Sequence, residues 1–173
     1  MPATENLLRR LLGERVELLA TLDDEAAHVL ADPAQLRQIL LNLVLNARDA
    51  MPGGGRIQLS THVAQLPGDG AHAKSRQAVS LVIQDNGCGM DAETRGRMFE
   101  PLFTTKNPGE GTGFGLATVQ RIVSEAQGTI EVESEPGCGT WISVVLPTVG
   151  VAAGPALSIA KKVRETHTAS PHS

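Results

Sequence analysis

The sequence predicts an α/β fold in which two long amphipathic helices alternate with short strands. Apolar residues recur at helical spacing over residues 33–51 and again over 114–127. Strand-like segments cover residues 16–22, 56–64, 77–85, 128–135 and 139–147. With 173 residues, of which 41% are hydrophobic, the chain can bury one core of ordinary size.

The helix over residues 33–51 is the best defined of these elements. Asp32 is a favourable N-cap, Pro33 suits the first helical position, and Gln35 completes a pattern close to a capping box. Pro52 and the three glycines that follow it end the helix.

These elements are predicted to form one domain at residues 15–148, bounded by a different kind of segment on each side. Residues 1–14, with a short helix at 5–12, are interpreted as a residual linker. From residue 149 to 173 small and polar residues dominate, which favours a flexible C-terminal tail or linker.

Charge and cysteine content exclude several classes of protein. A net charge of -4 argues against a nucleic-acid-binding surface, because no basic stripe is present to displace counterions from phosphates. Cys88 and Cys138 form no CxxC pair, so neither a disulfide framework nor a zinc site is expected. No apolar run approaches the roughly 20 residues that span a bilayer. We therefore expect a cytoplasmic domain without direct membrane contact, although the parent protein could be membrane-anchored.

A polar stripe runs beside the apolar face of the helix over residues 33–51. Its members are Gln35, Gln38, Asn42, Asn46 and Asp49. An asparagine amide offers an acceptor oxygen and two donors without charge, which suits a hard cation already held by phosphate oxygens. The alternative is that these are surface residues of an amphipathic helix.

A second motif follows the strand over residues 77–85, whose apolar face ends in Asp85. A carboxylate that points into a core needs donors, and the exocyclic amine of a bound base would provide one. Gly87 and Gly89 would let the backbone approach that ligand closely. The alternative is a strand-ending turn, because Asp-Asn-Gly favours turns.

Glycines at 109, 111 and 113 directly precede the helix over 114–127 and Gly115 lies in its first turn, so their N–H groups are placed to receive phosphates. The pattern is neither a Walker loop nor a Rossmann fingerprint, and a flexible linker is the alternative. Lys106 is either a contact to a terminal phosphate or a solvated lysine. Residues 99–114, preceded by a short helix after Asp91, contain all three phenylalanines and are expected to form a mobile lid.

Taken in order, "NLVLNARDAM", "DNGCGMD", "FEPLFTTK" and "GTGFGLA" resemble the N, G1, F and G2 boxes of sensor histidine kinases. The resemblance is to their ATP-binding catalytic domain, within the superfamily of gyrase, heat-shock-chaperone and mismatch-repair ATPases. It covers roughly residues 30–147. It implies a two-layer α/β sandwich, the Bergerat fold, with a mixed sheet of about five strands backed by about three helices.

The resemblance also implies a set of functional residues and the cofactors ATP and Mg2+. Asn46 would ligate Mg2+, Asn42 would face the phosphates beside it, and Asp85 would accept from the adenine amino group. Asn42, Asn46 and Lys106 form the implied catalytic set. The other implied nucleotide contacts are Asp49, Gly87, Gly89, Thr105, Lys106, Gly111, Thr112, Gly113, Gly115, Leu116 and Thr140. Phe99 and Phe103 would fasten the lid, and Thr140 would help Asp85 to hold adenine, directly or through water.

One difference from the hydrolytic members of the superfamily predicts the reaction. Those members carry a glutamate one turn before the Mg2+ asparagine, where this chain has Asn42, and no glutamate occurs between Pro33 and Gly55. An amide cannot take a proton from water at neutral pH, so rapid hydrolysis is disfavoured. Phosphoryl transfer needs mainly positioning and charge stabilisation, so a partner can bring the nucleophile.

The expected acceptor is a histidine on a separate dimerisation hairpin, which this sequence lacks. None of the five histidines is expected on a helix; they are His28, His62, His72, His167 and His172. The domain alone should therefore not autophosphorylate, and it is expected to be monomeric. A response-regulator receiver domain would act downstream. The alternatives are an ATPase switch, a serine kinase of the anti-sigma type, and a module that binds nucleotide without transferring phosphate.

Overall fold

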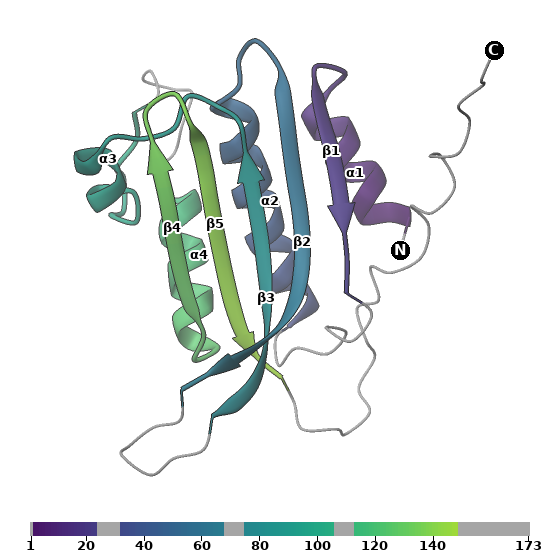
Figure 1. The fold of residues 1–173 in the computed structure, drawn as a ribbon, viewed down its shortest axis with the longest axis vertical. Helices are drawn as coiled ribbons and strands as arrows, with labels where there is room; N and C mark the ends of the chain where they lie inside the picture. The colour runs from purple at the N-terminus through teal and green to yellow at the C-terminus, as the bar shows by residue number, and fades with distance from the viewer. Residues whose placement is uncertain (1, 24–31, 68–74, 106–112, 149–173) are drawn as a thin grey trace, which may run out of the picture.

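The computed structural model describes residues 2–23, 32–67, 75–105 and 113–148, and these form two layers (Figure 1). A five-stranded sheet is one layer, and the helices α1, α2 and α4 cover one of its faces. The elements are α1 (Pro2–Leu12), β1 (Val16–Thr21), α2 (Pro33–Asp49), β2 (Gly55–Leu66), β3 (Arg76–Asp85), α3 (Ala92–Arg97), α4 (Gly115–Glu125), β4 (Thr129–Glu135) and β5 (Gly139–Pro147). The predicted two-layer sandwich is confirmed.

The sheet is mixed, with the strand order β1-β2-β3-β5-β4. β1 pairs with β2 in parallel, and the other three pairings are antiparallel. In this register Asp85 at the end of β3 lies directly opposite Thr140 at the start of β5. Directly opposed residues point to the same face of a sheet, so both side chains lie on the helix-covered side.

The core lies between the sheet and α1, α2 and α4. The largest fully buried side chains are Ile39, Leu43, Val44, Ile57, Val119, Ile122, Val123 and Val144. Each such side chain contributes about 1.5–3 kcal/mol when it is removed from water. The apolar stripe predicted for α2 is therefore the stripe that faces the sheet, and its neighbouring polar stripe lies at the edge of the core.

The ends of α2 follow the sequence signals. The Asp32 carboxylate accepts from the Ala34 N–H at 2.8 Å, and Pro33 occupies the first helical position. The helix ends at Asp49, two residues before the predicted end, because Ala50 and Met51 form a capping turn with carbonyls of the last helical turn.

Helix α1 is more closely integrated than the term linker implies. Leu8 and Leu12 are 4% and 5% exposed and belong to the core cluster. Arg48 of α2 donates from Nη1 to the Leu11 carbonyl oxygen at 2.9 Å. The assignment of residues 1–14 to a residual linker stays a prediction, but the last turn of α1 packs as part of this folded unit.

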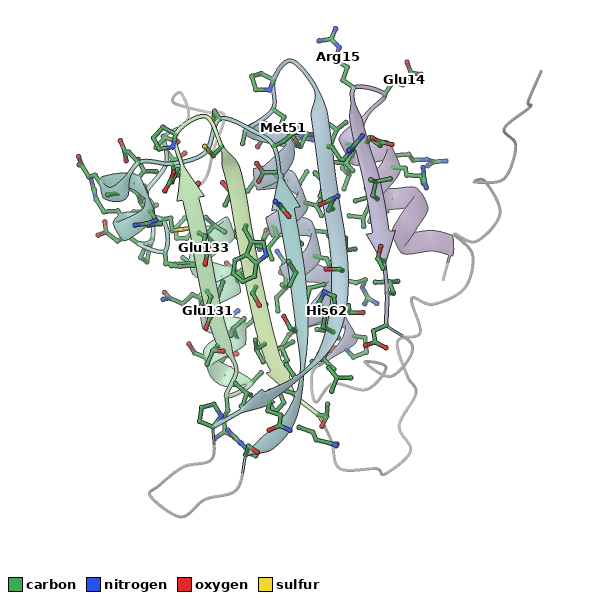
Figure 2. All side chains as sticks on the ribbon, in the orientation of Figure 1. Glu14, Arg15, Met51, His62, Glu131 and Glu133 are labelled. Carbon is green, nitrogen blue, oxygen red and sulfur yellow. The ribbon has the colours of Figure 1, made fainter. Side chains whose placement is uncertain are left out.

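No helix of the described residues covers the other face of the sheet (Figure 1). Figure 2 shows Glu131 and Glu133 of β4 and His62 of β2 on this face. Ser143 lies opposite Glu131, and its hydroxyl is 2.9 Å from that of Ser80 in a buried pair. His62 lies on a strand, as expected; the other four histidines lie outside the described residues. No helix in the described part of the chain is both long and apolar enough to cross a bilayer.

Candidate nucleotide-binding site

Asn42 and Asn46 lie one turn apart on α2 and are both half-buried. The Nδ2 atom of each is buried without a hydrogen-bond partner among the described residues. Buried polar groups almost always have partners, so two adjacent exceptions indicate that something else binds there. A 180° rotation of either amide exchanges its donor and acceptor ends, so each offers a phosphate donor or a metal ligand.

The first turn of α4 faces the Asn42 amide. A Cβ atom built on Gly115 would lie 3.7 Å from Asn42 Oδ1, which is ordinary van der Waals contact. The N-terminus of α4 carries a partial positive charge and free N–H groups, which favour an anion. The orphaned amides and this helix terminus together fit a phosphate chain with a bound hard cation, so the residues present fit ATP·Mg2+.

Asp85 is the only buried carboxylate among the described residues, with 7% of its surface exposed. Desolvation by burial raises the pKa of the Asp85 carboxyl, although the backbone N–H groups of Gly87 and Thr140 act in the opposite direction. The Gly87 N–H donates to Asp85 Oδ1 at 2.9 Å. Since burial outweighs these donors, the carboxylate has capacity for a further donor, such as an exocyclic amine.

Gly87 and Gly89 are required by packing within the protein. A Cβ on Gly87 would lie 2.6 Å from the Ala50 carbonyl oxygen, at the end of α2. Gly89 has φ +65°, and a Cβ there would overlap the Glu135 carbonyl oxygen. The Cys88 N–H donates to the same Ala50 oxygen at 3.0 Å, which joins this loop to α2. Their role in lining a base pocket stays a prediction.

Thr140 is 8% exposed and lies beside Asp85, as the register requires. Its Oγ1 is 3.0 Å from Ser134 Oγ on the neighbouring strand β4. Sequence reasoning missed Ser134, which is 6% exposed. It continues the helix-facing row of Ile130 and Val132, and this is the same signal, a polar residue that ends an apolar row, that indicated Asp85.

The predicted lid is described up to residue 105 and again from residue 113. The Leu102 N–H donates to the Gly113 carbonyl oxygen at 3.0 Å, so the two ends of the segment meet. Leu102 and Gly113 have φ +67° and +68°, and a Cβ on Gly113 would lie 2.5 Å from the Leu102 backbone. Thr105 is exposed and Leu116 is half-buried. Lys106, Gly111 and Thr112 lie outside the described residues.

The phenylalanines of this segment differ in their environments. Phe99 is partly buried against the core cluster. Phe103 lies under the Arg97 guanidinium, whose central carbon is 4.4 Å from the ring centroid. Phe114 is 50% exposed. The attachment of the lid by Phe99 and Phe103 is consistent with these contacts, and the motion of the lid stays a prediction.

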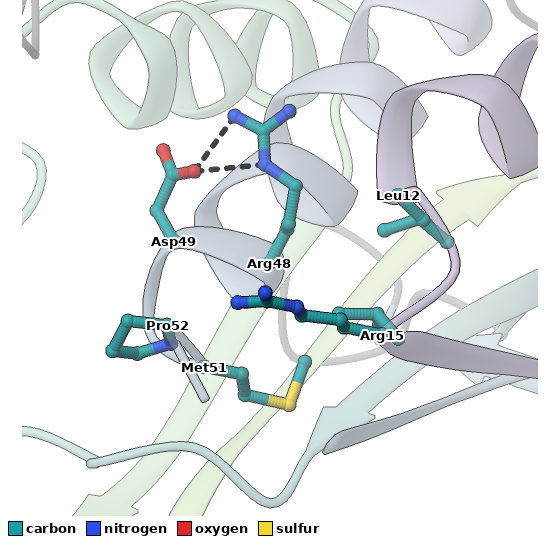
Figure 3. A pocket seen from close by; sticks show the side chains of 7 residues that line it. Leu12, Arg15, Arg48, Asp49, Met51 and Pro52 are labelled. Carbon is teal, nitrogen blue, oxygen red and sulfur yellow. Dashed lines mark hydrogen bonds and ion pairs between the residues drawn. The ribbon is translucent and has the colours of Figure 1, made fainter. Parts of the chain in front are cut away.

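Asp49 is the last residue of α2. Its Oδ1 accepts from Nε and Nη2 of Arg48 at 2.9 and 2.7 Å (Figure 3). A pocket of about 410 Å3 adjoins it. The pocket is lined by Leu12, Arg15, Val16, Arg48, Asp49, Met51 and Pro52. The nucleotide contact of Asp49 stays a prediction, because here its carboxylate is bound by Arg48.

Comparison with known proteins agrees with this geometry. The family model of the histidine kinase-, DNA gyrase B-, and HSP90-like ATPases matches residues 31–150. Over 133 residues the chain is 41% identical to the signal transduction histidine-protein kinase AtoS of Escherichia coli strain K12. The matched region covers 77% of this chain and 20% of AtoS. The mycobacterial sensor histidine kinase MprB superposes with a TM-score of 0.68 at 27% identity, over 85% of this chain and 92% of that chain. Full-length ShkA, solved in complex with AMPPNP, superposes with a TM-score of 0.67 at 28% identity. The match covers 88% of this chain and 30% of the ShkA chain.

The chain therefore belongs to the histidine kinase-, DNA gyrase B-, and HSP90-like ATPase family. AtoS, ZraS of Klebsiella oxytoca and MprB are histidine kinases, and within the family the chain is a protein-histidine kinase catalytic domain. Family membership supports ATP binding by this domain. The chain spans between 15 and 27% of the length of the first curated relatives it matches.

Proposed function

We propose that this chain binds ATP·Mg2+ beside the polar stripe of α2 and donates the γ-phosphoryl group to a histidine on a separate dimerisation domain. The observation that carries the proposal is the pair of buried, unpartnered amides at Asn42 and Asn46. They offer neutral ligands for a metal and its phosphates, and they include no carboxylate that could deprotonate water.

Each end of the site has a separate task. Asn46 would hold Mg2+ through its amide oxygen, and Asn42 would contact the phosphate chain from one turn earlier. When bound, Mg2+ supplies charge that stabilises the transferring phosphoryl group. Asp85 would orient the nucleotide by accepting from the adenine amino group. Gly113, Gly115 and Leu116, together with Thr105, Lys106, Gly111 and Thr112, would surround the phosphates.

The partners follow from the same chemistry. The nucleophile has to come from outside the domain, so a dimerisation hairpin with the acceptor histidine is the first partner, and a response-regulator receiver domain is the second. We propose that the domain is monomeric in isolation, and that it acts in the cytoplasm, where ATP is available as the donor.

A mixing experiment tests the proposal. The purified chain is incubated with a dimerisation hairpin from a relative, Mg2+ and ATP labelled at the γ-phosphate. We expect acid-labile label on the hairpin, as a phosphohistidine would give, and none on the chain alone. Phosphate release without labelled hairpin would instead favour an ATPase switch, and nucleotide binding with neither product would favour a non-transferring module.

A variant adds a test of the metal role. Asn46→Ala is expected to weaken ATP binding in Mg2+ but to leave the weaker binding measured in chelator unchanged, by calorimetry in both buffers. Gln38→Ala, on the same polar stripe and one turn earlier than Asn42, is the matched control and should bind like the wild type. Equal loss in both buffers would count against Asn46 as the metal ligand.

A further inference from the structure

Ser134 of β4 joins the loop after β3 to the start of β5 through its buried hydroxyl. The Met90 N–H donates to Ser134 Oγ at 2.8 Å, from the loop that follows Asp85. Ser134 in turn donates its proton to the Gly139 carbonyl oxygen at 3.0 Å. The third contact, 3.0 Å long, is to Thr140 Oγ1. Three groups, one from the loop after β3 and two from the start of β5, therefore meet on one oxygen atom.

The number of protons decides the direction of the third contact. A serine hydroxyl has one proton, and that of Ser134 is used on Gly139. The Met90 N–H can only donate. All three contacts are hydrogen bonds at once only when the proton between Ser134 and Thr140 comes from Thr140, so that Ser134 Oγ accepts twice. With its proton turned inward, Thr140 Oγ1 presents only lone pairs to a ligand.

The side chain next to Thr140 is also an acceptor. Asp85 lies directly opposite Thr140 in the β3–β5 register, and a carboxylate has no proton to donate when ionised. Two adjacent acceptors match the exocyclic amino group of a 6-aminopurine, which has two N–H donors. They repel the carbonyl oxygen that a 6-oxopurine carries at the same position, because lone pairs then face lone pairs.

We propose that Ser134 is a positioning residue that sets base selectivity, by holding the Thr140 hydroxyl in the orientation that accepts from a 6-aminopurine and disfavours a 6-oxopurine. The inference rests on the proposed function, since it assumes that the nucleotide base lies beside Asp85. Ser134 itself need not touch the nucleotide. Without Ser134, the Thr140 hydroxyl is free to rotate and donate to a 6-oxo group.

The test compares ATP with inosine triphosphate, each with Mg2+, by calorimetry on the whole 173-residue chain. We expect the wild type to favour ATP, and Ser134→Ala to reduce the ratio of the two dissociation constants by about threefold to tenfold, the range that one neutral hydrogen bond provides. Ser134→Thr keeps the hydroxyl and should restore the wild-type ratio.

Ser143→Ala is the matched control. Like Ser134, Ser143 is a buried serine with a hydroxyl partner, but it lies on the central strand β5 and on the opposite face of the sheet from Thr140. The Ser143→Ala variant should lose comparable stability and keep the wild-type ratio of the two dissociation constants. If Ser134→Ala keeps the wild-type ratio, or weakens both nucleotides equally, Ser134 has only a structural role and the inference is overturned.

Thr140→Val provides a second route that leaves Ser134 in place. It removes the hydroxyl and should reduce the ratio of the dissociation constants for inosine triphosphate and ATP. Adding Ser134→Ala to Thr140→Val should change this ratio no further, because Ser134 acts through Thr140. A further change in the double variant would refute this dependence. If the wild type binds neither nucleotide, the proposed function itself fails, whereas ATP binding without selectivity overturns only the inference.

Discussion

Replacing Asp85 with asparagine should have opposite effects on nucleotide binding and on the stability of the nucleotide-free domain. Burial raises the pKa of the Asp85 carboxyl above its ordinary value. A carboxyl whose folded pKa exceeds its unfolded pKa stabilises the fold below the unfolded pKa, and this contribution is lost as the pH rises through the folded pKa. At neutral pH the ionised carboxylate is therefore a net cost to the fold. Asp85→Asn removes the charge, and its amide oxygen can still accept from Gly87.

The loss in binding follows from the lost hydrogen bond. A hydrogen bond to a charged group contributes about 1.5–3 kcal/mol, which corresponds to roughly a 10- to 150-fold increase in Kd for ATP. The upper end is expected, because an amide that keeps its oxygen toward Gly87 turns its own N–H donors toward the adenine amino group.

Two measurements check this prediction. Urea unfolding between pH 4 and 8 should show Asp85→Asn at least as stable as the wild type at neutral pH, with a weaker pH dependence in the acid range. Calorimetry with ATP should show the loss of binding. A variant that is less stable at neutral pH while binding ATP normally would refute the reasoning.

Asp91 is a control whose pKa shift, and therefore whose effect on the pH dependence of stability, runs in the direction opposite to that of Asp85. Hydrogen bonds from the backbone and side chain of Thr94 lower the pKa of this exposed N-cap. Its contribution to stability is present above the unfolded pKa and is lost as the pH falls through the folded pKa. Asp91→Asn should therefore remove a pH dependence that runs in the other direction, and it should leave ATP binding unchanged.

Three further changes have defined outcomes. Asn42→Glu places a carboxylate one turn before Asn46, and a phosphate-release assay should show faster ATP hydrolysis than in the wild type; an unchanged rate would contradict the role given to this position. Gly89→Ala should lower the free energy of unfolding in urea by about 1–3 kcal/mol or more, because φ is +65° and a Cβ has no room. Gly96→Ala is its control and should leave the free energy of unfolding unchanged, because there is open space around Gly96. Arg48→Ala removes the bond to Leu11 and should speed hydrogen exchange in α1 relative to α4; equal exchange would show that this bond does not hold α1.

Much of the fold was predictable because its signals are local. The N-cap and proline at the start of α2 act within one helical turn, and the structure has both where the sequence placed them. Strand-like composition between turn residues likewise marked the five strands of the described residues, since both signals lie within each segment. The order of the four boxes also identified the family.

The candidate site was only partly predictable. The position of Asp85 at the end of an apolar row revealed that it is buried, but Ser134 was missed because no motif surrounds it. Likewise, sequence spacing placed Asp49 on the same stripe as Asn46, but spacing cannot show that the neighbouring Arg48 takes its carboxylate and also reaches α1.

By itself the sequence determined the elements, the polar stripe of α2 and the family, because these depend on residues close together in the chain. Only the tertiary structure decided which polar atoms are left without partners, which carboxyl is desolvated, and which hydroxyl points where. Those properties arise where distant segments pack against one another: β3 against β5, β4 against the loop after Asp85, and α1 against α2. A side chain's charge and hydrogen bonding depend on how much water that packing leaves around it, and no local pattern records this.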